Sequence, residues 1–99
     1  MKSLFITGIG TDVGKTVVSA IVTEALNADY WKPIQAGQLS NSDSHKIKAL
    51  ISNPHSKIFE NSYALKTPMS PHAAAEIDDI RIDSKKIAKP TTTNNLVIE

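Results

Sequence analysis

The amino-acid sequence predicts an α/β fold in which helices flank a mainly parallel sheet. Three features support this prediction. Short apolar runs at residues 4–7 and 96–98 are typical of parallel strands buried on both faces, and we expect the first to be a central strand. Residues 17–26 form a broad apolar run at helical spacing, which predicts a largely buried helix. A glycine-rich stretch at residues 8–16 lies between the first strand and this helix.

Residues 8–16 read Gly-Ile-Gly-Thr-Asp-Val-Gly-Lys-Thr, as in a phosphate-binding loop. Its backbone N–H groups and the start of the following helix favour an anion. In such a loop Lys15 reaches the terminal phosphates and Thr16 holds Mg²⁺. Ile9 stands where the usual pattern has a glycine, so we expect a variant loop, one residue longer on its strand side. The predicted fold is therefore P-loop NTPase-like, with Rossmann-type layers; an ordinary helix start is the alternative.

Length and composition narrow the class of protein. The chain has 99 residues, which is short for a doubly wound sheet, so we expect a truncated chain, the N-terminal part of a single nucleotide-binding domain. The net charge is +1 without a long run of either sign, so we expect no nucleic-acid partner. Cysteines are absent, and no apolar stretch is long enough to span a membrane. Without a signal peptide, a cytoplasmic protein that does not bind membranes is expected.

The second predicted strand, residues 28–32, ends at Lys32, and we expect residues 33–37 to form a stiff turn. Parallel strands place their carboxyl ends at one edge of the sheet, where ligands of α/β folds bind. Lys32 and Glu99, at the ends of two strands, are therefore candidates for the phosphate site. The alternatives are a solvated lysine and a chain-end glutamate without a role.

Asp43 has two interpretations. Either it or Ser42 caps a helix over residues 45–51, or its carboxylate is a Mg²⁺ ligand beside Thr16. Further along, we expect an extended piece at residues 63–65, a helix starting at Pro71 after a Ser70 cap, and a short helix over residues 83–88. We interpret His72 as a packing or surface residue.

Five stretches of this sequence together resemble dethiobiotin synthetase, an ATP-dependent ligase family of biotin biosynthesis. The resemblance spans the whole chain in the family's order: residues 8–16, Lys32-Pro33 with Gln35 and Gly37, residues 41–43, Thr67-Pro68 with Ser70-Pro71-His72, and residues 96–99. It implies ATP and Mg²⁺ as cofactors and a homodimer. The implied reaction joins 7,8-diaminononanoate and CO₂ or bicarbonate through a carbamate, which ATP phosphorylates before the second amine closes the ureido ring.

The resemblance also implies roles for individual residues. Lys15 would contact the phosphates and the carbamate, Lys32 would stabilise the carbamate and the transferring phosphoryl group, and Thr11 would line the carbamate side. The implied nucleotide-binding residues are Asp12, Val13, Gly14, Lys15 and Thr16, with Asp12 also on the substrate side. The implied magnesium ligands are Thr16, Asp43 and Glu99.

Two departures from the family accompany the resemblance. Ala36 stands where the family usually has a hydroxyl beside the carbamate, so Gln35 or water would replace that hydrogen bond. The family's adenine site, much of its dimer interface and its partner-supplied carboxylate pocket lie beyond Glu99. A P-loop amidotransferase-type synthetase, a partitioning-type regulatory ATPase and an inactive nucleotide-binding fragment are the alternative functions.

Overall fold

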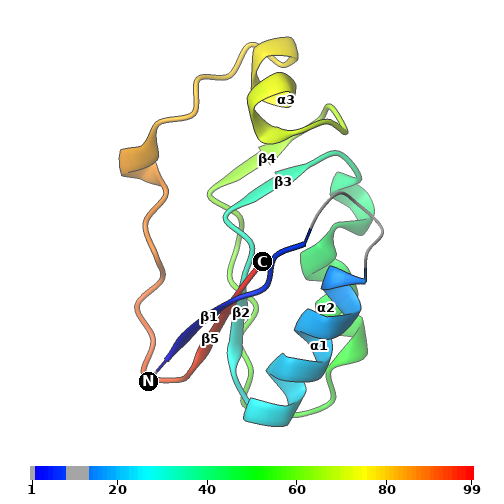
Figure 1. The fold of residues 1–99 in the computed structure, drawn as a ribbon, viewed down its shortest axis with the longest axis vertical. Helices are drawn as coiled ribbons and strands as arrows, with labels where there is room; N and C mark the ends of the chain where they lie inside the picture. Colours follow the sequence, from blue (N-terminus) through cyan, green and yellow to red (C-terminus); the bar gives the residue numbers. More distant parts are fainter. Residues whose placement is uncertain (1, 9–13) are drawn as a thin grey trace.

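The fold is seen in a computed structural model that describes residues 2–8 and 14–99. Its strands are β1 (Ser3–Phe5), β2 (Asp29–Trp31), β3 (Ile34–Ala36), β4 (Tyr63–Leu65) and β5 (Leu96–Ile98). Its α-helices are α1 (Lys15–Leu26), α2 (Asp43–Leu50) and α3 (Pro71–Ile77), and short 3₁₀-helices cover Leu39–Asn41 and Ser84–Lys86. Figure 1 shows their arrangement. No helix in this described part of the chain is long and apolar enough to cross a bilayer.

Three strands form a parallel sheet in the order β1-β5-β2, which confirms the predicted parallel pairing. The last strand in the sequence is the middle one, because β5 pairs with β1 on one side and with β2 on the other. A second, two-stranded parallel sheet joins β3 to β4. The carboxyl ends of β1, β2 and β5 therefore meet at one edge of the first sheet.

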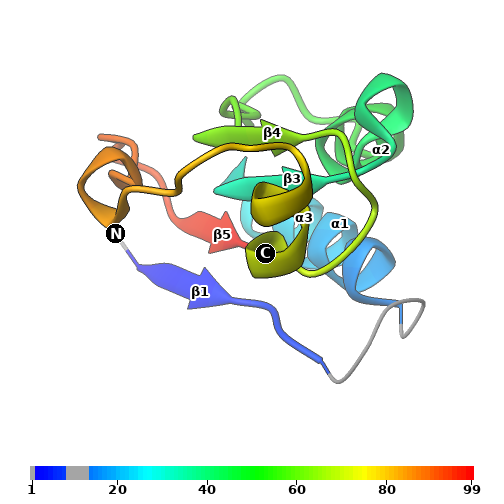
Figure 2. The same cartoon turned by 90° about the horizontal axis from the view of Figure 1, so that it is seen from above.

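The two faces of the first sheet are covered differently. Alternation along the strands turns Tyr30 and Val97 to one face, where they pack with Ala20 of α1 and Ile47 of α2. Side chains on the other face pack against irregular chain rather than a helix: Trp31, Leu96 and Ile98 contact Phe59 and Ile87. In Figures 1 and 2 the segment from α3 to β5 accordingly runs along the opposite side of the molecule from α1 and α2.

The expectation that the first strand is central and buried is wrong for this structure. β1 is an edge strand, and the Phe5 side chain is 74% exposed. The physical reason is the position of β5, which takes the central place and leaves the other side of β1 without a strand in the described residues.

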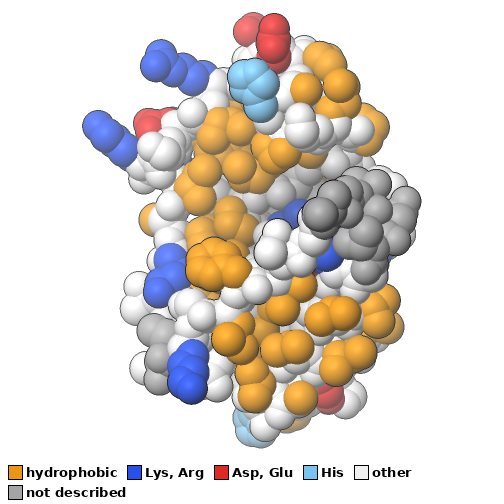
Figure 3. Space-filling model, viewed as in Figure 1, with side chains coloured by type: hydrophobic (Ala, Val, Ile, Leu, Met, Phe, Trp, Pro, Cys, Tyr) orange, Lys and Arg blue, Asp and Glu red, His pale blue; other side chains and the backbone are white. Residues whose placement is uncertain are grey.

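The expectation of a largely buried α1 is also wrong. Val17 and Ile21, one helical turn apart, are 56% and 62% exposed, whereas Ser19, Ala20 and Thr23 are buried. Small side chains let α1 approach β5 and α2 closely, so the helix turns its less apolar side inward. Its larger apolar side chains remain on the surface of the face shown in Figure 3.

The predicted stiff turn at residues 33–37 is instead a strand, β3, ended by a glycine. Pro33 breaks the ladder of β2, as expected, but its carbonyl accepts from Ser62 and Tyr63 and brings β4 alongside. Gly37 then leaves the strand with φ +77° while its N–H donates to Leu65 at 2.8 Å. The change from turn to strand came from a partner more than twenty residues away in the sequence, which local residues do not reveal.

The remaining elements follow the predictions closely. α2 is capped by Ser42, α3 starts with Pro71 after Ser70, and β4 occupies the predicted extended piece. The helix predicted over residues 83–88 is only a 3₁₀ turn over Ser84–Lys86. The backbone N–H of Lys85 donates to the Asp83 side chain at its start.

Candidate functional site

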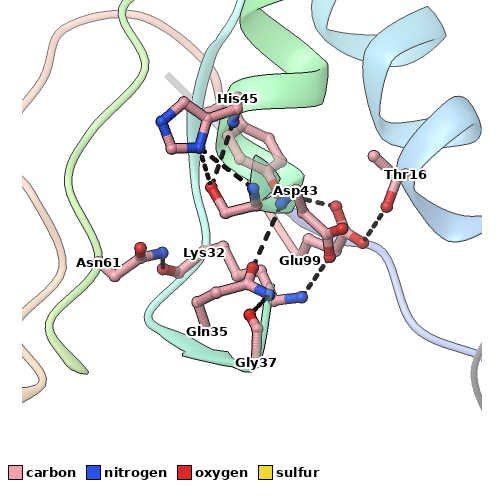
Figure 4. Close-up of polar contacts among 10 residues, drawn as sticks. Thr16, Lys32, Gln35, Gly37, Asp43, His45, Asn61 and Glu99 are labelled. Atoms are coloured by element: carbon pink, nitrogen blue, oxygen red, sulfur yellow. Dashed lines mark hydrogen bonds and ion pairs between the residues drawn. The ribbon is translucent and has the colours of Figure 1, made fainter. Parts of the chain in front are cut away.

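The site lies where the carboxyl ends of β2 and β5 meet the amino ends of α1 and α2. Residues two apart on a strand share a face, so Lys32 follows Tyr30, and Glu99 follows Val97, towards the face covered by the two helices. Figure 4 shows Thr16, Lys32, Asp43 and Glu99 converging there from four different segments. The sheet topology thus brings together the residues predicted at this edge.

Thr16 and Glu99 are joined directly. The Thr16 hydroxyl donates to Oε2 of Glu99 at 3.0 Å, across 83 positions of the sequence. Thr16 is the second residue of α1, after Gly14 has turned the chain with φ +82° as the helix N-cap and Lys15 has begun the helix. The Glu99 carboxylate therefore lies at the start of the phosphate-loop helix.

Lys32 and Asp43 form an ion pair between β2 and α2. Both side chains are mostly shielded, at 20% and 19% exposure. Burial raises the pKa of Asp43, but the hydrogen bond and the positive charge of Lys32 outweigh it and hold that pKa below its ordinary value. Asp43 is thus a carboxylate at neutral pH, and it is paired with Lys32.

The start of α2 leaves the Asp43 carboxylate available for this contact. Ser42, not Asp43, is the N-cap: its Oγ accepts from His45 N at 3.3 Å, and its own N–H donates to the His45 ring at 3.1 Å. Gln35 steadies the same turn, because its Oε1 accepts from Asp43 N at 3.3 Å and its Nε2 donates to Gly37 O at 3.0 Å. The capping alternative for the Asp43 side chain is therefore wrong.

A cleft of about 990 Å³ opens beside these residues. Its walls come from the start of α1, the end of β2, β3, α2 and the loop before α3. Gly14, Lys15, Thr16, Lys32, Ala36 and Asp43 are among the lining residues. Glu99 is not a lining residue and reaches the cleft through Thr16. His72 is exposed and does not line the cleft either, as expected of a surface residue.

The donor chemistry of the site fits a hard divalent cation. Thr16 contributes a hydroxyl oxygen, and Asp43 and Glu99 contribute carboxylates, the ligand types that Mg²⁺ takes while keeping several waters. In the described ranges no three His, Cys, Asp or Glu side chains gather as a metal cage. The hydroxyl and the two carboxylates are oxygen donors of the kind that hold Mg²⁺ together with a phosphate.

Part of the predicted site is not described. Thr11, Asp12 and Val13 lie outside the described residues, and so does most of the predicted variant loop. The sequence reasoning missed one residue that the structure adds: the buried Tyr30 hydroxyl donates to Oε1 of Glu99 at 2.7 Å. The sequence spacing already indicated this residue, because Tyr30 is two positions before Lys32 on the same strand and therefore lies on the same face.

Known proteins are similar to this chain along its whole length. Residues 2–99 match a family model described as an AAA domain. Proteins named ATP-dependent dethiobiotin synthetase BioD are similar to the chain: that of Christiangramia forsetii is 70% identical over 98 residues, which cover 99% of this chain and 47% of the relative. That of Chlamydia pneumoniae is 50% identical, covering 100% and 44%. That of Cytophaga hutchinsonii is 53% identical, covering 100% and 48%.

These matches define how far the likeness extends. The chain spans about half the length of the curated relatives it matches. No solved structure matches the chain. Because the family model covers residues 2–99, and with them α1, both sheets and Glu99, the chain belongs to the family described as an AAA domain, and it is similar along its whole length to ATP-dependent dethiobiotin synthetases.

Proposed function

We propose that the complete protein carrying this sequence is an ATP-dependent dethiobiotin synthetase, which closes the ureido ring of 7,8-diaminononanoate with CO₂ and releases ADP and phosphate. The observation that supports it most is the convergence of the Lys32–Asp43 ion pair and the Thr16–Glu99 hydrogen bond at the start of α1 (Figure 4). This geometry suits several phosphoryl transfers, and the names of the relatives specify which one.

Electrostatics explains why the reaction needs this arrangement. One substrate amine captures CO₂ as a carbamate, whose oxygen then attacks the γ-phosphate, so two negative groups must approach each other. In the proposal Lys15, at the first position of α1, and Lys32, at the end of β2, face the reactants with positive charge. Asp43 keeps the flexible Lys32 side chain at the cleft.

Thr16, Asp43 and Glu99 would hold Mg²⁺, which when bound offsets the charge of the phosphates. The lowered pKa of Asp43 supports this assignment, because a metal ligand must be ionised at the working pH. Within the described residues, the backbone after Gly14 would contact the phosphates at the start of the helix. The proposal assigns the same cradle to Asp12 and Val13, and the carbamate side to Thr11.

The second amine then attacks the carbonyl of the phosphorylated carbamate, the ring closes, and phosphate leaves. Ala36 lines the cleft and has no hydroxyl. The nearby Gln35 amide already makes hydrogen bonds with the backbone of Gly37 and of Asp43. We therefore assign the hydrogen bond to the carbamate at this point to water rather than to Gln35. The proposal keeps the expectations of a homodimer and a cytoplasmic location, which gel filtration and cell fractionation would test.

The test is phosphate release from ATP by the complete protein, with and without diaminononanoate and bicarbonate, together with mass spectrometry of the product. The proposal expects phosphate release that depends on the diamine and a product with the mass of the cyclic urea. ATP hydrolysis that is indifferent to the diamine would refute it and favour a regulatory ATPase. An amide product formed from a carboxylate substrate would instead favour the amidotransferase-type synthetase.

A further inference from the structure

Tyr30 is a buried side chain that neither the predicted site nor the proposed reaction uses. It lies in the middle of β2 and is 0% exposed. Its ring belongs to the core cluster that includes Ala20 of α1, Ile47 of α2 and Val97 of β5. The ring is therefore held by the packing of both helices that begin at the site, and its hydroxyl has little freedom to move.

The hydroxyl of Tyr30 meets the carboxylate of Glu99. It donates to Oε1 at 2.7 Å, while the other oxygen, Oε2, accepts from Thr16 at 3.0 Å. Strand register explains this hydrogen bond, because Tyr30 is opposite Val97 and Glu99 is the next residue of that strand on the same face. The two oxygens of Glu99 thus face different partners, one in the core and one at the start of α1.

The Tyr30 hydroxyl can only donate in this contact. An ionised carboxylate only accepts hydrogen bonds, so the phenol is the donor of this pair. Glu99 therefore receives a fixed donor on Oε1, which leaves Oε2 directed towards Thr16.

We propose that Tyr30 is a positioning residue for the metal site, which orients the Glu99 carboxylate so that Oε2 faces Thr16 and the divalent cation. This inference rests on the proposed function, because it takes Glu99 and Thr16 as the magnesium ligands. Hydrogen-bond partners of metal ligands commonly determine the orientation of the ligand, and losing one weakens metal binding. Tyr30 does this from the hydrophobic core, so the packing of α1 against α2 is linked to the cation site.

The test measures the affinity of the complete protein for Mn²⁺, used as a paramagnetic probe for Mg²⁺, by electron paramagnetic resonance in the presence of a non-hydrolysable ATP analogue. Tyr30→Phe removes one oxygen and keeps the ring. We expect the Mn²⁺ affinity to fall about tenfold, and excess Mg²⁺ to restore kcat. Tyr63→Phe is the matched control: Tyr63 also uses its hydroxyl in one hydrogen bond, from Asp83 N at 2.9 Å, away from the site. Its Mn²⁺ affinity should equal that of the wild type.

Glu99→Gln and the double variant Tyr30→Phe/Glu99→Gln complete a double-mutant cycle, in which the Mn²⁺ affinity of all four proteins is compared. If Tyr30 acts through Glu99, adding Tyr30→Phe to Glu99→Gln changes the Mn²⁺ affinity less than twofold. A full tenfold loss in that background, or an unchanged affinity in Tyr30→Phe alone, would overturn the inference. If Glu99→Gln binds Mn²⁺ like the wild type, Glu99 is not a ligand and the inference also fails. The proposed reaction is decided separately by whether the wild type makes the cyclic urea.

Discussion

Replacing Gly37 by alanine tests the turn that follows β3, where the backbone approaches Pro68 in the loop before α3. Gly37 has φ +77°, a conformation that costs a residue with a side chain about 1–2 kcal/mol. An added Cβ would also lie 2.5 Å from Cβ and 2.7 Å from Cα of Pro68, whose backbone cannot give way easily. Such overpacking typically costs about 1–3 kcal/mol. We therefore expect Gly37→Ala to lower the free energy of unfolding by about 2–5 kcal/mol.

Gly14 provides the matched control for this substitution. It has nearly the same backbone angle, φ +82°, but an added Cβ would meet no atom of the described residues within 4 Å. Gly14→Ala should therefore cost only the backbone strain, about 1–2 kcal/mol. The measurement is urea denaturation of the complete protein without nucleotide, followed by circular dichroism. If Gly37→Ala is no more destabilising than Gly14→Ala, the close approach of Gly37 to Pro68 does not contribute and the steric argument is refuted.

Three further predictions concern the site and its supports. Lys32→Ala should lower kcat by about 10²–10³, or about 3–4 kcal/mol, because it removes charge that stabilises the transition state; turnover within a few-fold of wild type in steady-state kinetics would contradict this. Ser42→Ala should cost about 1 kcal/mol of unfolding free energy by removing the N-cap of α2, measured by urea denaturation, and a neutral result would show the cap to be unimportant. The pKa of Glu24 is lowered to about 2 by hydrogen bonds from Ser52 and Asn53, so its stabilising contribution is complete above pH 4.5 and is lost as the pH falls from 4.5 towards 2. Glu24→Gln should accordingly flatten the fall of Tm across that range in thermal scans, and an unchanged slope would contradict the assignment.

Several features of the fold could be predicted from residues close together in the sequence. The Ser42 cap, the start of α3 at Pro71 and the end of β2 before Pro33 all depend on local backbone chemistry, and the structure agrees with each. Ser70 also occupies the predicted N-cap position of α3, but its side chain makes no capping hydrogen bond. The placement of Lys32 and Glu99 at one edge also followed from the sequence, because parallel strands have a common direction. These predictions needed only short-range preferences and one topological rule.

Other features depended on contacts between distant parts of the chain. The strand at Ile34–Ala36 exists because β4 pairs with it, and β1 is exposed because β5 occupies the central place. Hydropathy also misjudged α1, whose buried side is the one with small residues, since close helix packing selects for size as well as for polarity. None of these outcomes can be obtained from a window of neighbouring residues.

By itself, the sequence determined the phosphate-loop helix, the parallel class of the sheet and the residue types of the site. Only the tertiary structure decided how those residues pair: Lys32 with Asp43, Thr16 with Glu99, and Glu99 with Tyr30. The physical reason is that side-chain pairing depends on strand order and register, which insert β5 between β1 and β2 and align Val97 with Tyr30. Local propensity carries no information about either quantity, so the partner of Glu99 became visible only once the sheet was assembled.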